Sequence, residues 1–155
     1  MEYPHQPVLV HEVVKYLVSI PEGTYVDGTV GTGGHSQAVG NCLSGKGRLI
    51  CLDVDPDAVS VSRKRMAFLG DNVRIMKATY ADIDKVLADL GCKAIDGVLL
   101  DLGMSSYQLE KSGRGFSFSR NEPLDMRMDP ENKLTALHLV NNLEPKDLER
   151  LFKDY

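Results

Sequence analysis

The chain has 155 residues, with 18 Lys and Arg against 22 Asp and Glu, which gives a formal net charge of −4. Apolar residues make up 43% and charged residues 26%, so collagen-like, low-complexity and wholly disordered classes are excluded. The length suits one domain. No apolar run approaches the roughly 20 residues of a membrane-spanning helix, and the N-terminus lacks a signal-peptide layout, so we expect a cytoplasmic protein with no membrane partner.

Cysteine and histidine usage argues against disulfide and metal sites. Cys42, Cys51 and Cys92 are odd in number, and their spacing fits neither a disulfide framework nor a zinc site, so we expect reduced thiols in the core. No histidine and carboxylate cluster has ligand spacing, and no metal is predicted. The acidic balance disfavours attraction of nucleic acid to the whole surface, so any RNA contact must be local.

Hydrophobic periodicity predicts alternating helices and strands. A helix is expected over about 7–20, then a strand at 25–27, a glycine cluster, a helix at 35–43 and a buried strand at 48–52. They are followed by a helix at 55–69, a strand at 73–76, a helix at 83–90 and a strand at 95–100. This order predicts an α/β fold with a doubly wound parallel sheet and helices on both faces.

The rest of the chain has a different character. Residues 102–130 show neither the helical nor the strand periodicity of apolar residues. Their glycines, arginines and large apolar residues favour a functional loop over a disordered linker. Helices are expected at 135–142 and 145–153, the last with an apolar face that no later segment meets. Four strands are also few for a doubly wound enzyme, so we expect an incomplete fold.

The strongest local signal is the sequence DGTVGTGGH at 27–35, between the first strand and the next helix. Its glycines let the backbone approach a ligand, and the helix N-terminus offers unpaired N–H groups, so a nucleotide-like cofactor is predicted. A turn that merely needs positive φ is the plainer alternative.

Asp53 ends the second strand, 22 residues after Gly31, where a carboxylate can accept hydrogen bonds from ribose hydroxyls. A nicotinamide cofactor would fit as well, but the third glycine of its fingerprint falls on Ser36. Asp27, before the turn, suits a cofactor with a positive ammonium, so S-adenosylmethionine is favoured. An NAD(P)-dependent oxidoreductase is the alternative.

A reactive centre is expected where the fourth strand ends. Asp101 leads there into Ser105 and Ser106, at the sheet edge where open α/β folds bind ligands. A carboxylate and flanking carbonyls could accept N–H hydrogens of an exocyclic amine and aim its lone pair at a methyl group. The alternatives are that Asp101 only caps a turn, and that Ser105 is a nucleophile, although it lacks the usual elbow and an identifiable base.

Six segments together resemble the MraW-type (RsmH) methyltransferases of small-subunit ribosomal RNA. They are HQPVL at 5–9, DGTVGTGGHS at 27–36, DVDP at 53–56, DGVLLDLGMSSYQL at 96–109, RGFSF at 114–118 and PLDMRM at 123–128. The resemblance implies a Rossmann-like class I fold and an enzyme that uses S-adenosyl-L-methionine to methylate the exocyclic N4 of a cytidine in 16S ribosomal RNA.

The resemblance also implies site residues. The cofactor contacts of the family fall on Gly33, Gly34, His35, Asp53, Tyr80, Asp101 and Gln108. The glycine turn would take the methionyl end, Asp53 the ribose and Tyr80 the adenine, while Asp101 and Gln108 would border the methyl group. RNA would be held by Arg114, Phe116, Arg120 and Arg127, although the charges of that loop cancel and its phenylalanines could instead fold it.

Some positions depart from the family pattern, such as Tyr80 where Phe is usual and Tyr107 where Pro is common. Family members continue for roughly as many residues again. We therefore expect a cofactor-binding domain at 1–112 and, at 113–155, a substrate loop with the beginning of an inserted helical domain. The expected partner is 16S ribosomal RNA within the small subunit, with a homodimer left open. A truncated module that binds cofactor or ribosome without turnover is the non-enzymatic alternative.

Overall fold

A computed structural model describes residues 7–154, which divide into two compact units. The first unit is Met1–Gly103 and the second is Met104–Tyr155. The boundary expected after residue 112 lies within the second unit, because the contacts that define that unit begin with a short helix before it. Within residues 7–154, no helix is long and apolar enough to cross a membrane.

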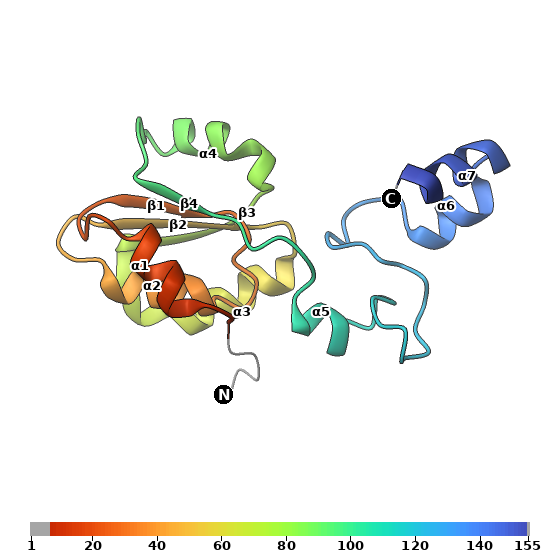
Figure 1. The fold of residues 1–155 in the computed structure, drawn as a ribbon, viewed down its shortest axis with the longest axis horizontal. Coiled ribbons are helices and arrows are strands. Elements are labelled where there is room, and N and C mark those ends of the chain that lie inside the picture. The colour runs from red at the N-terminus through yellow and green to blue at the C-terminus, as the bar shows by residue number, and fades with distance from the viewer. Residues whose placement is uncertain (1–6, 155) are drawn as a thin grey trace. The chain divides into compact units, whose positions relative to one another are not determined.

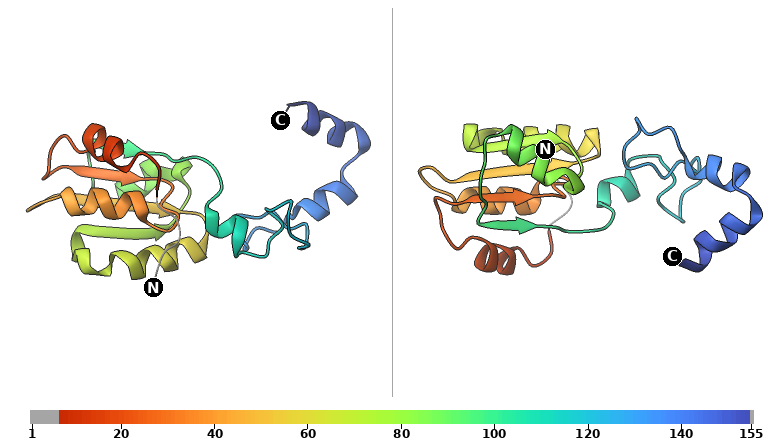
Figure 2. Two further views of the ribbon diagram at one scale, coloured as in Figure 1. Left: turned by 60° about the horizontal axis from the view of Figure 1, so that its bottom comes forward. Right: turned by 90° about the horizontal axis from the view of Figure 1, so that it is seen from above.

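The first unit is built on a four-stranded sheet in the order β3-β2-β1-β4 (Figures 1 and 2). Every neighbouring pair of strands is parallel. The strands are β1 (Thr24–Asp27), β2 (Arg48–Asp53), β3 (Val73–Lys77) and β4 (Gly97–Leu99). The helices are α1 (Val10–Leu17), α2 (Gly34–Cys42), α3 (Pro56–Met66) and α4 (Ile83–Asp89), with the 3₁₀ helices η1 (Ala67–Asn72) and η2 (Tyr80–Asp82).

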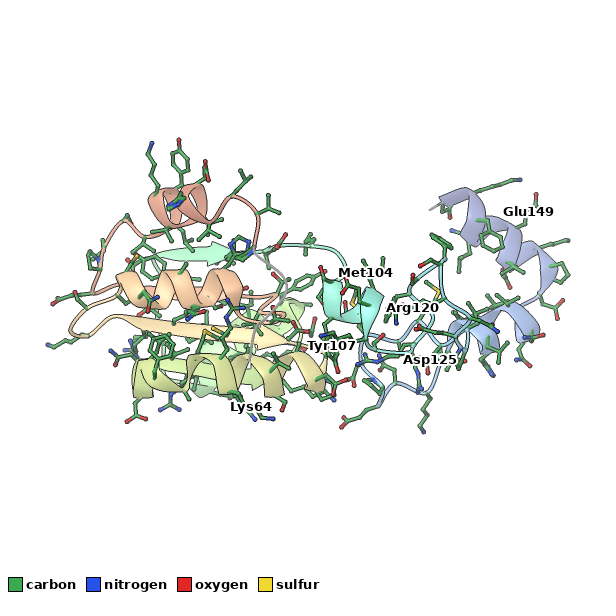
Figure 3. All side chains as sticks on the ribbon, turned by 90° about the horizontal axis from the view of Figure 1, so that it is seen from below. Lys64, Met104, Tyr107, Arg120, Asp125 and Glu149 are labelled. Atoms are coloured by element: carbon green, nitrogen blue, oxygen red, sulfur yellow. The ribbon has the colours of Figure 1, made fainter. Side chains whose placement is uncertain are left out.

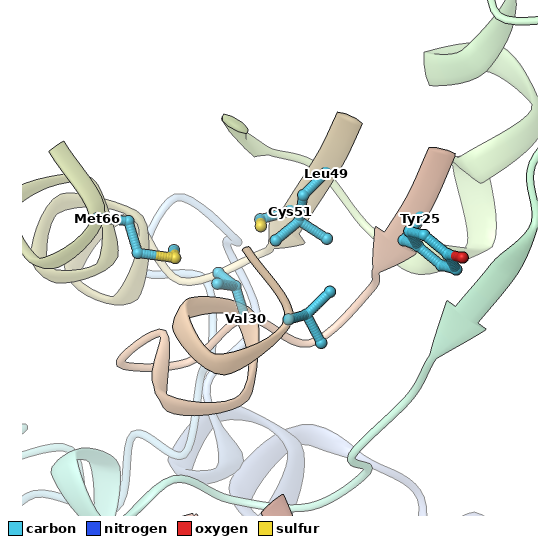
Figure 4. Packing of buried hydrophobic residues seen from close by; sticks show 6 residues of the cluster. Tyr25, Val30, Leu49, Cys51 and Met66 are labelled. Atoms are coloured by element: carbon cyan, nitrogen blue, oxygen red, sulfur yellow. The ribbon is translucent and has the colours of Figure 1, made fainter. Parts of the chain in front are cut away.

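Helices cover both faces of the sheet, which confirms the predicted doubly wound parallel fold. Helices α1, α2 and α3 lie on one face and α4 on the other (Figure 1). The core on the first face contains Tyr25, Val30, Val39, Leu49, Cys51 and Met66, most of them labelled in Figure 4. The core on the α4 face contains Val26, Ile50, Leu52 and Val86. Strands β1 and β2 supply side chains to both cores, so they are the most buried part of the sheet.

The cysteine prediction needs one correction. All three thiols are free, and Cys51 and Cys92 are buried as expected. Cys42 is exposed, because it is the last residue of α2 and lies outside the apolar face of that helix.

Local chemistry explains where several elements begin and end. The Asp55 carboxylate accepts a hydrogen bond from the N–H of Asp57 at 3.0 Å, and Pro56 opens α3, as the sequence predicts. Helix α1 is shorter than expected, since Leu9 takes a left-handed conformation and the helix begins after it. Strand β4 is also shorter, because the Asp101 N–H binds a side chain where a longer strand would bind a backbone carbonyl.

Strand β3 forms one edge of the sheet, and Arg63 of α3 reaches it. The Arg63 guanidinium donates to the Ile75 carbonyl through Nε at 3.1 Å and Nη2 at 2.7 Å. This contact occupies a carbonyl on an edge strand, where unpaired backbone groups can recruit another chain.

The second unit contains α5 (Ser106–Glu110), α6 (Ala136–Asn142) and α7 (Pro145–Asp154). The last two were expected. Helix α5 lies inside the segment predicted to lack regular structure, so that prediction is wrong for these five residues. A helix this short shows no period, and its start is encoded instead by the Ser105 and Gln108 capping box.

Candidate functional site

The candidate site lies at the carboxyl ends of β1, β2 and β4. The chain leaves β1 for β2 on one side and later returns to place β4 on the other side of β1. Such a reversal opens a crevice at the carboxyl edge of a parallel sheet, where ligands bind in open α/β folds. The glycine-rich turn at 28–34 follows β1 and leads into α2 at this edge.

The turn takes a backbone shape that needs glycine. Gly31 and Gly33 have φ of 50° and 80°, in the left-handed region that other residues rarely adopt. A Cβ on Gly33 would also lie 3.1 Å from the Met66 side chain and 3.3 Å from that of Ser62. The turn is tied to its surroundings by hydrogen bonds from the Val30 N–H to the Leu52 carbonyl and from the Gly33 N–H to the Val30 carbonyl. The N-terminal N–H groups of α2 are thereby held at the edge of the sheet.

Asp53 holds this turn from the end of β2. Its carboxylate accepts hydrogen bonds from the N–H of Gly31 at 2.8 Å and from the N–H of Asp55 at 2.9 Å. Burial raises the pKa of Asp53, while these two hydrogen bonds oppose the shift. A carboxylate has further lone pairs, so Asp53 can shape the turn and still accept from a ligand hydroxyl. The sequence predicted the second role and missed the first.

Asp27 acts on the turn from within the core. It is only 2% exposed, and it accepts hydrogen bonds from the Ser36 hydroxyl at 2.5 Å and the Thr29 N–H at 3.0 Å. Burial is the main cause of a raised pKa for Asp27. The idea that Asp27 faces a positive ammonium is therefore corrected, because its oxygens are turned to donors of the chain and away from solvent.

His35 and Asp101 face one another at the mouth of the site. His35 Nε2 lies 3.6 Å from Asp101 Oδ2, and the Asp101 side chain is 68% exposed. His35 Nδ1 is buried and has no hydrogen-bond partner within the described residues. Because buried polar atoms are normally hydrogen-bonded, this nitrogen is a candidate contact for a polar group of a ligand. The structure thus brings together two residues 66 positions apart that the resemblance assigns to the cofactor.

Tyr80 lies beside the turn in η2, after β3. A Cβ placed on Gly28 would fall 2.8 Å from the Cβ of Tyr80 and 2.6 Å from the Leu100 side chain, so the absence of a side chain at Gly28 allows both to approach. Tyr80 is exposed. About half of its surface is accessible, so the ring is able to stack on a planar ligand group.

The second unit contains the remaining residues of the predicted catalytic and cofactor set. The Ser105 hydroxyl accepts from the Gln108 N–H at 3.2 Å, and the Gln108 side chain accepts from the Ser105 N–H at 2.9 Å. Gln108 is buried, and Ser106 is the first residue of α5. These contacts show that Ser105 and Gln108 form the capping box that begins α5. The catalytic roles expected for Ser105 and Ser106 stay predictions.

The loop expected to hold RNA is organised by its own arginines. Arg114 is buried, and its Nη1 donates to the carbonyls of Arg127 at 3.1 Å and Met128 at 2.8 Å. The Arg114 carbonyl in turn accepts from the N–H of Met126. Phe116 is buried, whereas Phe118 is fully exposed. The two segments RGFSF and PLDMRM therefore fold against each other, and Arg114 and Phe116 serve that fold.

Asp125 and Arg127 add a second internal tie. The Arg127 guanidinium contacts both oxygens of Asp125, at 2.8 and 2.6 Å, and lowers the pKa of that carboxyl to about 2. Its Nη1 also donates to the carbonyls of Pro130 and Asn132. Arg120 Nη1 lies 3.9 Å from Glu122 Oε1, and the Arg120 side chain is half-exposed. Arg120 and Asp125 both lie in the segment between α5 and α6 (Figure 3).

Metal ligands are not grouped in the described part of the chain. No three His, Cys, Asp or Glu side chains among residues 7–154 are placed to hold a metal ion. The polar groups of the site are instead carboxylates, an imidazole and backbone N–H groups, a set suited to an organic ligand with hydroxyl and charged groups.

Known proteins show what the chain is similar to. Residues 2–155 match the MraW methylase family. The chain is 46% identical over 156 residues to the ribosomal RNA small subunit methyltransferase H of Heliobacterium modesticaldum, covering all of this chain and 50% of that relative. A second such enzyme, from Agathobacter rectalis, is 47% identical with the same coverage. The chain spans about half the length of the curated relatives it matches.

A solved structure supports the fold independently of close sequence similarity. The O-methyltransferase from Bacillus cereus, in complex with SAH, aligns with a TM-score of 0.50 at 19% identity. The alignment covers 63% of this chain and 46% of that protein. The aligned part of the chain therefore shares the fold of that protein.

Proposed function

Because the chain belongs to the MraW methylase family, we propose that it is the cofactor-binding part of a ribosomal RNA methyltransferase. The cofactor is S-adenosylmethionine, and the substrate is the exocyclic N4 of a cytidine in 16S ribosomal RNA of the small subunit. The observation that carries the proposal is the glycine turn tied to Asp53, with Asp101 and the unpartnered His35 nitrogen at the same sheet edge. Such an enzyme works in the cytoplasm, where its RNA substrate is assembled.

The residues fit the cofactor in chemical type. Gly33 shapes the turn through the hydrogen bond of its N–H to the Val30 carbonyl, while Gly34 and His35 offer backbone N–H groups and one buried ring nitrogen to the carboxylate and ammonium end. Asp53 retains lone pairs for the ribose hydroxyls, and the exposed Tyr80 ring suits the adenine. Bound there, S-adenosylmethionine supplies an electrophilic methyl group on a sulfonium. The contribution of Gln108 from the second unit is part of the same proposal.

Asp101 would position the nucleophile. Its exposed carboxylate accepts an N–H hydrogen of the cytosine amine and directs the nitrogen lone pair toward the methyl carbon. With the cofactor bound, its methyl group would pass to this nitrogen, and the role of Asp101 would be to hold the amine in line while the amine proton leaves to water or to a neighbouring carboxylate. The site thus works by orientation more than by acid and base chemistry. Ser105 and Ser106 are proposed to lie near this centre, without a nucleophilic role.

The second unit is proposed to contact RNA. Phe118 is fully exposed and Arg120 half-exposed, so they offer an aromatic face and a cation to an unpaired base and a phosphate. Arg114, Phe116 and Arg127 would support this contact by holding the loop in shape. A homodimer and the 1–112 and 113–155 domain division remain proposals.

Calorimetric titration tests the cofactor. We expect saturable binding of S-adenosylmethionine to this chain and none of NADH or NADPH on the same preparation. Preference for a nicotinamide cofactor would overturn the methyltransferase proposal in favour of an oxidoreductase.

Turnover is a separate measurement. Single-turnover transfer of a labelled methyl group to undermethylated small ribosomal subunits, followed by nucleoside analysis, tests the cytidine N4 assignment. Methylation of another base would contradict that assignment. Binding without transfer would favour a non-catalytic cofactor-binding module.

A further inference from the structure

A hydroxyl joins the glycine turn to the end of β4. Strands β1 and β4 are paired up to Asp27 and Leu99, and the Gly28 N–H then donates to the Leu99 carbonyl at 3.0 Å. The next hydrogen bond between these two segments involves a side chain. The Asp101 N–H donates to the Thr29 Oγ1 at 2.7 Å, so a threonine hydroxyl takes the place of a backbone carbonyl.

The Thr29 hydroxyl is itself held by the buried carboxylate of Asp27. Asp27 Oδ1 accepts from the Thr29 N–H at 3.0 Å and lies 3.5 Å from the Thr29 hydroxyl oxygen. The other oxygen of Asp27 accepts from Ser36 of α2 at 2.5 Å. With its proton toward Asp27, the Thr29 oxygen turns a lone pair to Asp101, and hydrogen bonds in such a chain strengthen one another.

Asp101 is therefore held through its backbone, and its side chain lies close to His35. Thr29 holds its backbone N–H, and His35 lies 3.6 Å from its carboxylate. Thr29 lies in the glycine-rich turn, and His35 lies in α2 directly after it. The position of Asp101 is thus set from the same turn that would hold the cofactor.

We propose that Thr29 is a positioning residue for methyl transfer: its hydroxyl fixes Asp101 relative to the cofactor-binding turn. This inference rests on the proposed function. Reaction rates depend steeply on the placement of reacting groups, and an error of about 1 Å can cost on the order of 100-fold. Loss of the hydroxyl should therefore slow transfer far more than it weakens cofactor binding.

Two matched variants isolate the hydroxyl. Thr29→Val keeps the shape of the side chain without the hydroxyl, and Thr29→Ser keeps the hydroxyl with one methyl fewer. For Thr29→Val we expect the single-turnover rate at saturating S-adenosylmethionine to fall at least about tenfold, with cofactor affinity within about threefold of wild type. Thr29→Ser should recover most of the rate. A purely structural role would lower the thermal midpoint of both variants without this separation of rate from affinity.

Amide exchange gives a readout that does not depend on turnover. NMR-detected exchange of the Asp101 N–H should be at least about tenfold faster in Thr29→Val and near wild type in Thr29→Ser. Unchanged exchange in Thr29→Val, or a Thr29→Ser variant as slow in transfer as Thr29→Val, would overturn the proposal. Failure of the proposed function is visible separately, as wild-type chain that does not bind S-adenosylmethionine.

Discussion

The two units of this chain are stabilised in different ways. The first encloses two apolar clusters on either face of its parallel sheet. Among the described residues of the second, only Gln108, Arg114 and Phe116 are buried. The first unit thus depends on apolar burial, while the second depends on side chains that donate hydrogen bonds to backbone carbonyls or accept them from backbone N–H groups.

This difference changes how charged residues are interpreted. In the first unit, Asp27 and Asp53 accept hydrogen bonds from the backbone of the turn beside the candidate site, so they set the shape of the segment that is proposed to bind the cofactor. In the second unit, Arg114 and Arg127 are residues of the type that binds RNA. Their guanidinium groups nevertheless bind Met128 and Asp125 of the same loop. The exposed Phe118 and Arg120 are the better candidates for intermolecular contact.

The largest expected effect is on the apolar core. Leu52 has no exposed surface, so Leu52→Ala should lower the free energy of unfolding of the first unit by about 2 to 5 kcal/mol. Local amide exchange should show no comparable change at Met126 in the second unit. The exposed Leu102 provides a matched control, with about 0.5 kcal/mol or less expected for Leu102→Ala. Equal loss of protection in both units would contradict two separate stabilising mechanisms.

Removal of a buried guanidinium is the corresponding test of the second unit. Arg114→Ala leaves the carbonyls of Arg127 and Met128 without their donor, and we expect a local loss of about 2 to 3 kcal/mol. Faster amide exchange at Met126 measures it. Arg120→Ala removes a half-exposed guanidinium whose Nη1 lies 3.9 Å from Glu122 Oε1, and it should cost about 0.5 kcal/mol or less. A larger effect from Arg120 than from Arg114 would reverse the assignment of structural and exposed arginines.

A third test concerns the carboxylate at the glycine turn. Asp53→Ala removes the acceptor of the Gly31 N–H and a charged acceptor for ribose hydroxyls. We expect S-adenosylmethionine binding to weaken by about 1 kcal/mol or more, roughly fivefold, as measured by calorimetry. Asp57→Ala is the control, since Asp57 is an exposed acid in the first turn of α3. Unchanged affinity in Asp53→Ala would remove Asp53 from the site.

The smallest expected effects appear as opposite pH dependences. Burial raises the pKa of Asp53 above its usual 3.8, so its contribution to the free energy of unfolding decreases as pH rises through that range. Arg127 lowers the pKa of Asp125 to about 2, so that contribution is complete above pH 3.8 and is lost as pH falls toward 2. NMR titration of the side-chain carboxyl carbons measures the pKa of Asp53 and that of Asp125. If both pKa values moved in the same direction from 3.8, the contrast between the two units would be refuted.

The sequence predicts the sheet well because buried strands are short apolar runs. Runs such as the one at 48–52, ended by an aspartate and flanked by glycine or proline, locate each strand within a few residues. The site residues of the first unit follow, since turns after β1, β2 and β4 must meet at one edge. What periodicity could not show is the internal use of Asp27, which depends on the Ser36 hydroxyl nine residues later.

The second unit was less predictable for a physical reason. Its order comes from contacts between polar groups far apart in the segment, such as Arg114 with Met128, which have no periodic signature. Arginine is usually exposed, so burial of Arg114 is not expected from its residue type. One signal was present: a serine followed three residues later by glutamine predicts the start of α5.

The Arg63 guanidinium on the Ile75 carbonyl gives the two borders of the sheet unequal capacity for growth. A strand arriving beside β3 would have to displace two charge-assisted hydrogen bonds before it could pair at that residue. The Arg63 contact therefore makes the β3 border less open to a pairing strand at Ile75.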